Sequence, residues 1–133
     1  MKTLYRIIVS QLALVFVFTA CSNQPPESIP IEEQLSKKGY RIDQQVNRVT
    51  NYRLNGWSSV DRFNVIINVG ASTNYLITLR PACDGLRGAG GLAFSTTHGD
   101  LTDRDQLVIR PTANVNQYCP IHEIYVLVKI SNT

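Results

Sequence analysis

The sequence predicts a mainly β protein, a small antiparallel meander of five or six strands that closes to a partly open barrel, after a short N-terminal helical segment. Two observations predict this fold. Beyond Gly56, several runs place apolar residues at every second position, which is the period of a strand with one buried face. The runs are short and separated by turn-forming residues, and such spacing favours a closed or nearly closed sheet.

The first 20 residues are organised as a bacterial lipoprotein signal peptide. Lys2 and Arg6 form a basic end, and a nearly unbroken apolar run covers residues 7–18. Because a membrane-spanning helix needs roughly 20 apolar residues, this run is short for a permanent anchor. Two small residues precede Cys21, as at sites where a peptidase cuts before an acylated cysteine. Ordinary secretory cleavage and an uncleaved anchor are the alternatives.

We therefore expect lipid on Cys21 to anchor the protein to a membrane in the bacterial cell envelope, facing the periplasm. Stable anchoring of this kind takes at least two acyl chains. The next residue is Ser22 rather than aspartate, which favours the outer membrane over the inner one.

Removal of the signal leaves a nearly neutral chain. Lys2 and Arg6 are lost, so 11 of the 13 basic residues remain against 10 acidic ones, a net charge of about +1. Nucleic-acid binding depends on a basic face that contacts many phosphates, so this composition disfavours a nucleic-acid partner. The remaining length suits one domain rather than two.

Residues 21–39 are expected to form the acylated N-terminus and a flexible tether, because Pro25, Pro26 and Pro30 stand there among polar residues. Within this segment, residues 31–38 have the length of one or two helical turns. Residues 40–133 are expected to form a single small β domain.

The domain begins with a polar stretch over residues 40–52. Its apolar members are Ile42, Val46 and Val49, spaced by four and three, which favours a helix that lies on the domain as a lid. Asn51, Asn55 and Gly56 then interrupt the chain before the part with strand periodicity.

Two runs of period two, over residues 63–69 and 75–79, predict an antiparallel hairpin. Residues 82–91 contain four glycines and favour a short turn or helical corner. Further strands are predicted over residues 92–97, 107–110 and 121–130. The last needs a bulge between Ile121 and Ile124, because residues three apart do not otherwise share a face. Pro111 and Pro120 are placed outside these strands.

Several strands carry apolar residues on both faces, for example Leu76, Tyr125 and Leu127. Such residues either pack under the lid segment or form an exposed patch for a partner. Packing is the commoner arrangement.

With Cys21 acylated, Cys83 and Cys119 are an even pair in an oxidising compartment, and we predict a disulfide between them. Closing that loop stabilises the fold by roughly 4 kcal/mol in the chain-entropy model. The alternative is a metal site, since His122 follows Cys119 at metal-ligand spacing and His98 could join it. Structural zinc sites use paired ligands, which Cys83 and His98 lack, so we expect no metal.

The chain carries few signs of catalysis, and no cofactor is expected. Known nucleophile-elbow, metalloprotease and phosphate-loop motifs are missing. The aspartates within residues 100–105 lack the spacing of a calcium loop and favour a solvated hairpin tip. His98 with Asp100 could act as a base and its orienting acid. His122 and Glu123 are adjacent in a predicted strand, so their side chains should point to opposite faces.

Four aromatic residues are candidate ligand contacts: Trp57, Tyr75, Phe94 and Tyr125. They could stack on a small apolar molecule, a lipid or a glycan. Trp57 is the single tryptophan of the chain, and in a small domain such a residue is more often part of the core.

Spaced residues over about positions 48–130 resemble a known pattern. They are Trp57 with Asp61, Tyr75-Leu76 with Leu79, Cys83 with Leu86, and Cys119-x-Ile121-x-x-Ile124. This pattern resembles that of small proteobacterial envelope proteins catalogued as domain of unknown function number 6491. The resemblance implies a secreted or lipid-anchored domain with a paired-cysteine framework, and it implies no activity.

These observations favour a non-catalytic envelope lipoprotein whose domain binds or scaffolds an unknown envelope protein. The first alternative is a binding module for a small apolar molecule, lipid or glycan, which predicts a cavity lined by the four aromatic residues. The second is an enzyme that uses His98 and an aspartate, which predicts His98 beside Asp100 in a cleft.

Overall fold

The predicted hairpin forms the centre of the sheet in a computed structural model, which describes residues 29–96, 99–112 and 115–131. Its strands are β4 (Asn64–Val69) and β5 (Thr73–Leu79), paired antiparallel along their whole length. Val65 and Ile67 of β4 and Ile77 of β5 are fully buried. Alternation of β-branched residues therefore produces the strand and its buried face together.

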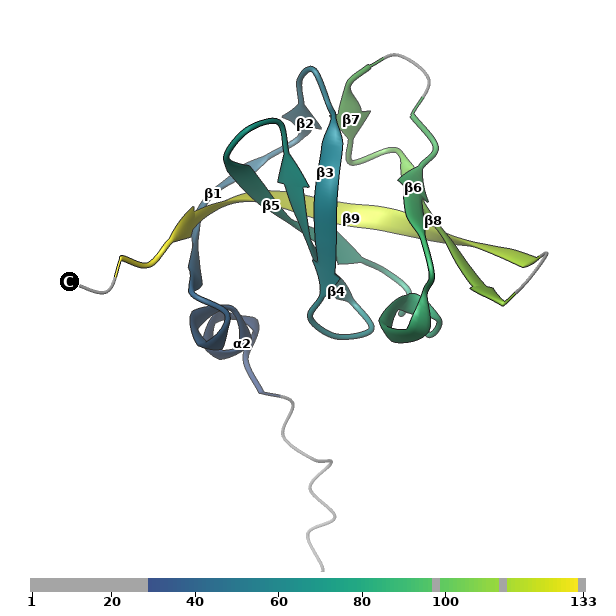
Figure 1. Ribbon diagram of the computed structural model, residues 1–133, viewed down its shortest axis with the longest axis horizontal. Helices are drawn as coiled ribbons and strands as arrows, with labels where there is room; N and C mark the ends of the chain where they lie inside the picture. Colours follow the sequence, from purple (N-terminus) through teal and green to yellow (C-terminus); the bar gives the residue numbers. More distant parts are fainter. Residues whose placement is uncertain (1–28, 97–98, 113–114, 132–133) are drawn as a thin grey trace, which may run out of the picture.

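The sheet is antiparallel and nearly closes on itself, as predicted (Figure 1). Neighbouring strands follow the order β3, β4, β5, β9, β8, β6, and β1 also pairs with β9. The remaining bounds are β1 Tyr40–Val46, β3 Leu54–Ser59, β6 Leu92–Phe94, β8 Gln106–Thr112 and β9 Val115–Lys129. The glycine-rich corner contains the 3-10 helix η1 (Leu86–Gly88), which is the helical corner that its composition favours.

The long strand β9 joins all parts of the sheet, because it pairs with β8 along its first half and with β5 and β1 along its second. The predicted bulge is present: Thr78 faces Glu123 while Leu79 faces Ile121, so His122 is the extra residue. The Thr78 hydroxyl accepts a hydrogen bond from the Glu123 N–H at 3.0 Å and donates one to the Glu123 carbonyl at 3.3 Å. The side chain thus satisfies backbone groups that the bulge takes out of the ladder.

Both prolines that were expected outside the strands lie within them. Pro111 is in β8, at the register shift between Ile109 and Thr112, and Pro120 is in β9 opposite Gln106. A proline removes only the donor of its position, and bulges and edges tolerate that loss. The Pro120 carbonyl still accepts a hydrogen bond from a neighbouring backbone N–H.

The prediction of a lid helix over residues 40–52 is wrong. This segment forms β1, which pairs with β9, and β2 (Arg48–Val49), which pairs with β7 (Leu101–Thr102). In β1 a register shift between Ile42 and Gln44 directs Ile42 to the outer core and Val46 to the inner core, so they do not share the one face that the helix prediction required. A spacing of four does not by itself distinguish a helix from a strand. Pairing with β9 decides between the two, and the sequence window holds no sign of that partner.

Two further strands were not predicted. β3 is polar, contains Asn55-Gly56 and pairs only with β4, so it is an edge strand without a clear apolar period. β7 is two residues long and lies inside the segment expected to be a polar hairpin tip. Its Leu101 is nevertheless fully buried.

The sheet has apolar residues on both faces, and each face has its own core. The inner core gathers inward side chains of β4, β5, β8 and β9, among them Ile67, Ile77, Leu107 and Ile124. The outer core contains Ile66, Leu76 and Leu127 and is covered by Leu35 of the helix α2 (Ile31–Lys37). Packing of the extra apolar residues is therefore confirmed, but α2 is the element that covers them, and Tyr40 and Ile42 of β1 pack beside them.

Helix α2 lies within the segment expected to be a tether. Its acidic first turn and its Lys37 in the last turn suit the helix dipole, and Leu35 is fully buried. The part of the chain that packs on the sheet therefore includes residues before position 40.

Candidate functional site

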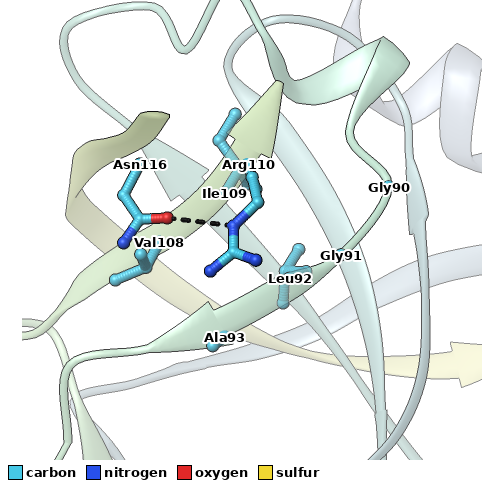
Figure 2. A pocket seen from close by; sticks show the side chains of 8 residues that line it. All are labelled: Gly90, Gly91, Leu92, Ala93, Val108, Ile109, Arg110 and Asn116. Atoms are coloured by element: carbon cyan, nitrogen blue, oxygen red, sulfur yellow. Dashed lines mark hydrogen bonds between the residues drawn. The ribbon is translucent and has the colours of Figure 1, made fainter. Parts of the chain in front are cut away.

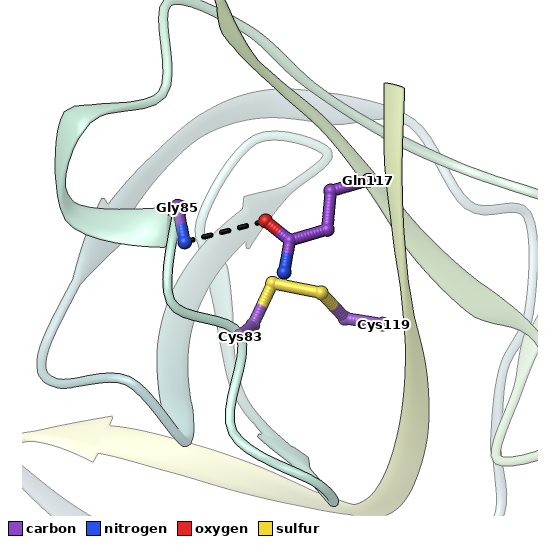
Figure 3. The surroundings of a disulfide bond; sticks show 4 residues. All are labelled: Cys83, Gly85, Gln117 and Cys119. Carbon is purple, nitrogen blue, oxygen red and sulfur yellow. Dashed lines mark hydrogen bonds between the residues drawn. A yellow bond between two sulfur atoms is a disulfide. The ribbon is translucent and has the colours of Figure 1, made fainter. Parts of the chain in front are cut away.

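Cys83 and Cys119 form the predicted disulfide, with their Cα atoms 5.8 Å apart (Figure 3). Both cysteines are buried in the inner core. Next to the bond, the Gly85 N–H donates to the side-chain oxygen of Gln117 at 3.3 Å. The pair ties the glycine-rich corner to β9, and neither sulfur is left as a thiolate for a metal.

Cys21 and His98, two residues singled out in the sequence, lie outside the described residues. The lipid attachment and the proposed base therefore stay predictions. Among residues 29–96, 99–112 and 115–131, no helix has the length and apolar character needed to cross a membrane.

The four candidate aromatic residues do not converge on one site. Trp57 and Tyr75 face Ile67 from either side in the sheet, and together with Phe94 they pack against the inner core. Tyr125 pairs with the outward Leu76 and packs against the outer core. The sheet thus separates Tyr125 from the other three.

Tyr52 joins the aromatic group, although the sequence did not mark it. Its ring meets that of Phe94 edge-on, with centroids 5.4 Å apart. Burial raises the pKa of Tyr52 to about 12, because a low-dielectric surrounding disfavours the phenolate. The Tyr52 N–H donates to the Gly99 carbonyl. Because Tyr52 precedes β3 and its ring contacts Phe94 of β6, it lies where β6 and the start of β3 approach each other.

His122 and Glu123 do approach each other, contrary to the expectation from strand alternation. The His122 Nε2 atom lies 3.8 Å from a Glu123 carboxylate oxygen, because His122 is the bulged residue and the alternation breaks there. The same carboxylate accepts a hydrogen bond from the Tyr125 hydroxyl. This bond, with burial and the nearby charges of Glu123 and Glu32, raises the pKa of Tyr125. The group holds Tyr125 over the outer core at the molecular surface.

The aspartates near β7 close turns. The Asp100 carboxylate accepts from the Asn51 N–H at 3.0 Å and lies 3.4 Å from the Arg48 guanidinium. Asp105 accepts from the Thr102 N–H at 2.7 Å. Over the described positions, no three His, Cys, Asp or Glu side chains gather as metal ligands.

An open hollow of about 560 Å³ lies on the other half of the sheet's outer face, over β6, β8 and the start of β9 (Figure 2). Ala93, Val108 and Tyr118 face one another across these three strands, so their side chains share that face. At one end, the Arg110 Nε donates to Asn116 at 3.3 Å. We call these five residues the outer-face patch.

The outer-face patch is exposed, whereas the equivalent face near α2 is covered. The Tyr118 side chain is 58% exposed, Ala93 and Arg110 are exposed, and Val108 is half-buried. Sequence reasoning missed Tyr118 because the last strand was expected to begin at Ile121, after Pro120, whereas β9 begins at Val115. Opposed positions become visible only once the strand pairing is known.

A second, more polar hollow of about 570 Å³ lies beside β1 and β2, where Gln45, Arg48, Asp103 and Glu123 line it. Neither hollow is lined by any of the four candidate aromatic residues. The cavity that the small-ligand alternative predicts is therefore not at either place.

Comparisons with known proteins give one match. A model of a family described as a family of unknown function (DUF6491) matches residues 4–130. No curated protein and no solved structure matches the chain.

Proposed function

The chain belongs to the family of unknown function DUF6491, and we propose that it is a non-catalytic envelope lipoprotein whose domain binds or scaffolds a partner protein. In this proposal, lipid on Cys21 anchors the chain to the periplasmic side of the bacterial cell envelope, at the outer membrane. The proposal of a protein partner rests on one observation, the exposed outer-face patch.

The outer-face patch has the composition of a protein-binding surface. An exposed tyrosine stands in a row with two small apolar residues, and an arginine borders the row. Tyrosine and arginine are enriched in protein interfaces, because each combines a large contact area with polar groups that stay satisfied on binding. The patch also rests on paired strands, which hold it in place before a partner arrives.

Helix α2 supports the same interpretation from within the molecule. Part of the sheet's outer face is apolar, and α2 buries that part. A partner segment bound to the outer-face patch would bury its exposed side chains in the way that α2 buries the outer core. Burial of apolar area is the main favourable term in such an association.

The alternative is a binding module for a small apolar molecule, lipid or glycan. The hollow of about 560 Å³ favours it by volume, since small-molecule sites commonly enclose roughly 300–1,000 Å³. The packing of Trp57, Tyr75 and Phe94 against the inner core disfavours it, because those rings are engaged inside the protein.

The lipid anchor predicts that Cys21→Ser releases the protein from membranes when residues 1–20 are replaced by an ordinary secretion signal that is cleaved without acylation. Two acyl chains or more hold a protein stably and their loss leaves a nearly neutral soluble chain. Membrane fractionation with intact-mass measurement of the mature chain checks this. Retention of the Cys21→Ser protein in the membrane fraction, or an unmodified wild-type mass, would contradict the anchor.

The partner proposal predicts site-specific capture in living cells. A photoreactive amino acid at Ala93 should crosslink one envelope protein, and Tyr118→Ala should abolish that product, because the two positions are neighbours across one strand. Ile130→Ala, which changes an exposed apolar residue beyond the other end of β9, should leave it. Electrophoresis and mass spectrometry read out the product. Equal capture with Tyr118→Ala would overturn the outer-face patch as the binding surface, and a small-molecule adduct instead would favour the alternative.

A further inference from the structure

One edge of the molecule brings together segments that are distant in sequence. Figure 1 shows α2, the loop between β3 and β4, and η1 along this edge, at the bottom of that view. Gln34 of α2 donates to the Asp61 carboxylate in the loop, at 3.3 Å. The Cys83 N–H donates to the Arg62 carbonyl at 2.7 Å and joins the loop to the segment before η1. These bonds make the edge one continuous surface.

Exposed apolar and basic side chains occupy this edge. Ile29 is 49% exposed and Phe63 is 42% exposed. The Arg62 guanidinium lies 5.7 Å from the centre of the Phe63 ring. Arg80 directly follows β5, Arg87 lies in η1, and both are exposed. We call these five residues the basal rim.

Two of the acidic groups near the basal rim, Asp84 and Glu33, are paired with a basic side chain. Asp61 accepts hydrogen bonds from the Phe63 N–H at 2.7 Å and from the Asn64 side chain. Asp84 pairs with Arg62 at 3.0 Å. In α2, Glu33 pairs with Lys37 at 3.0 Å. The charge of Glu32 is one of the causes that raise the pKa of Tyr125. Among the described residues, neither Arg80 nor Arg87 belongs to an ion pair, so both guanidinium groups can meet an approaching anionic surface.

The chain leaves the described domain at Ile29, within this edge. Seven residues, 22–28, lie between Ile29 and the anchor predicted at Cys21, and the eight Cα-to-Cα steps across them reach at most about 28 Å when fully extended. An anchor at Cys21 would therefore keep the basal rim close to the bilayer at high effective concentration. Weak contacts are then sufficient to hold an orientation.

We infer that the basal rim is a membrane-contacting surface, with Ile29 and Phe63 entering the interfacial region and Arg80 and Arg87 lying on anionic phospholipid headgroups. This inference rests on the proposed lipid anchor. Aromatic and aliphatic side chains flanked by arginine are the combination that binds at the lipid interface. The domain then stands on the membrane by this edge and keeps one orientation towards its partner.

The test uses the acylated full chain on vesicles of phosphatidylethanolamine and phosphatidylglycerol, with the Cys21→Ser chain in buffer as reference. Hydrogen–deuterium exchange should slow severalfold in residues 60–63 and 80–88 on the vesicles. Ile29→Ser with Phe63→Ser should remove this slowing. The matched control, Val115→Ser with Ile130→Ser, changes two equally exposed apolar residues elsewhere and should leave it.

Two separate failures can be told apart. A chain that is not acylated, or that does not float with the vesicles, would overturn the lipid anchor itself. An acylated, vesicle-bound chain whose basal rim exchanges as fast as in buffer would overturn only the membrane-contacting surface. Arg80→Gln with Arg87→Gln should weaken the slowing, and unchanged slowing would overturn the role given to the headgroups.

Discussion

Tyr52 illustrates how a single residue reports on closure of the barrel. Its ring contacts Phe94 of β6 while its backbone leads into β3, so it sits between the two end strands of the sheet order. Burial at this junction raises the pKa of Tyr52 to about 12. The sequence did not mark this residue, because a tyrosine beside Asn51 in a polar stretch has no local sign of burial.

The raised pKa predicts a loss of stability at alkaline pH. In the unfolded chain, a tyrosine loses its proton near pH 10, whereas folded Tyr52 keeps it to about pH 12. The contribution of Tyr52 is therefore fully present below about pH 10 and is lost as the pH rises through about 12. Tyr52→Phe keeps the ring and should reduce the fall in unfolding free energy across this window, as measured by urea unfolding. An equal fall in Tyr52→Phe and wild type would contradict this assignment.

Strands and the helix differ in how well local sequence predicts them. The hairpin of β4 and β5 was predicted because one face of each strand carries apolar residues at every second position, most of them β-branched or aromatic. β1 and β3 are half-exposed and polar, and β9 determines whether residues 40–46 form a strand. The bulge in β9 was visible in the spacing of Ile121 and Ile124, but its effect on His122 and Glu123 was not.

Helix α2 has seven residues, which is too short to be stable alone. Leu35→Ala removes its one fully buried side chain and should lower the free energy of unfolding by about 2–5 kcal/mol, since it leaves a cavity in the outer core. Ser36→Ala changes an exposed neighbour and should stay within about 0.5 kcal/mol of wild type. Thermal and urea unfolding of the two variants check this. Equal stability of both variants would mean that α2 does not hold the outer core.

The whole main sheet is held together by β9, which pairs with β1, β5 and β8 and so connects the β3–β4–β5 strands to β8 and β6. The disulfide fixes the glycine-rich corner to this strand over a sequence separation of 36 residues. The four candidate aromatic residues show the same dependence on tertiary arrangement, because the sheet puts three on its inner face and Tyr125 on its outer face.

Loss of the disulfide predicts a large change in global stability. Cys83→Ala with Cys119→Ala should lower the free energy of unfolding by roughly 4 kcal/mol, because the unfolded chain regains the entropy of an open loop of this length. Urea unfolding without reductant measures the difference. Wild type with reductant is the matched comparison and should fall by a similar amount. A change below about 1 kcal/mol in both would show that the loop is closed as firmly by packing.

Local sequence was enough to predict the class of the fold, the central hairpin, the bulge in β9 and the pairing of Cys83 with Cys119. These features follow from the period of side chains along one strand and from the number of cysteines, which are local or countable properties. Three features depend on tertiary contacts: residues 40–46 form a strand, α2 covers part of the outer face, and the outer-face patch stays exposed. Each of these depends on which distant segment pairs with a strand or covers it, and the residues of the strand alone do not identify that segment.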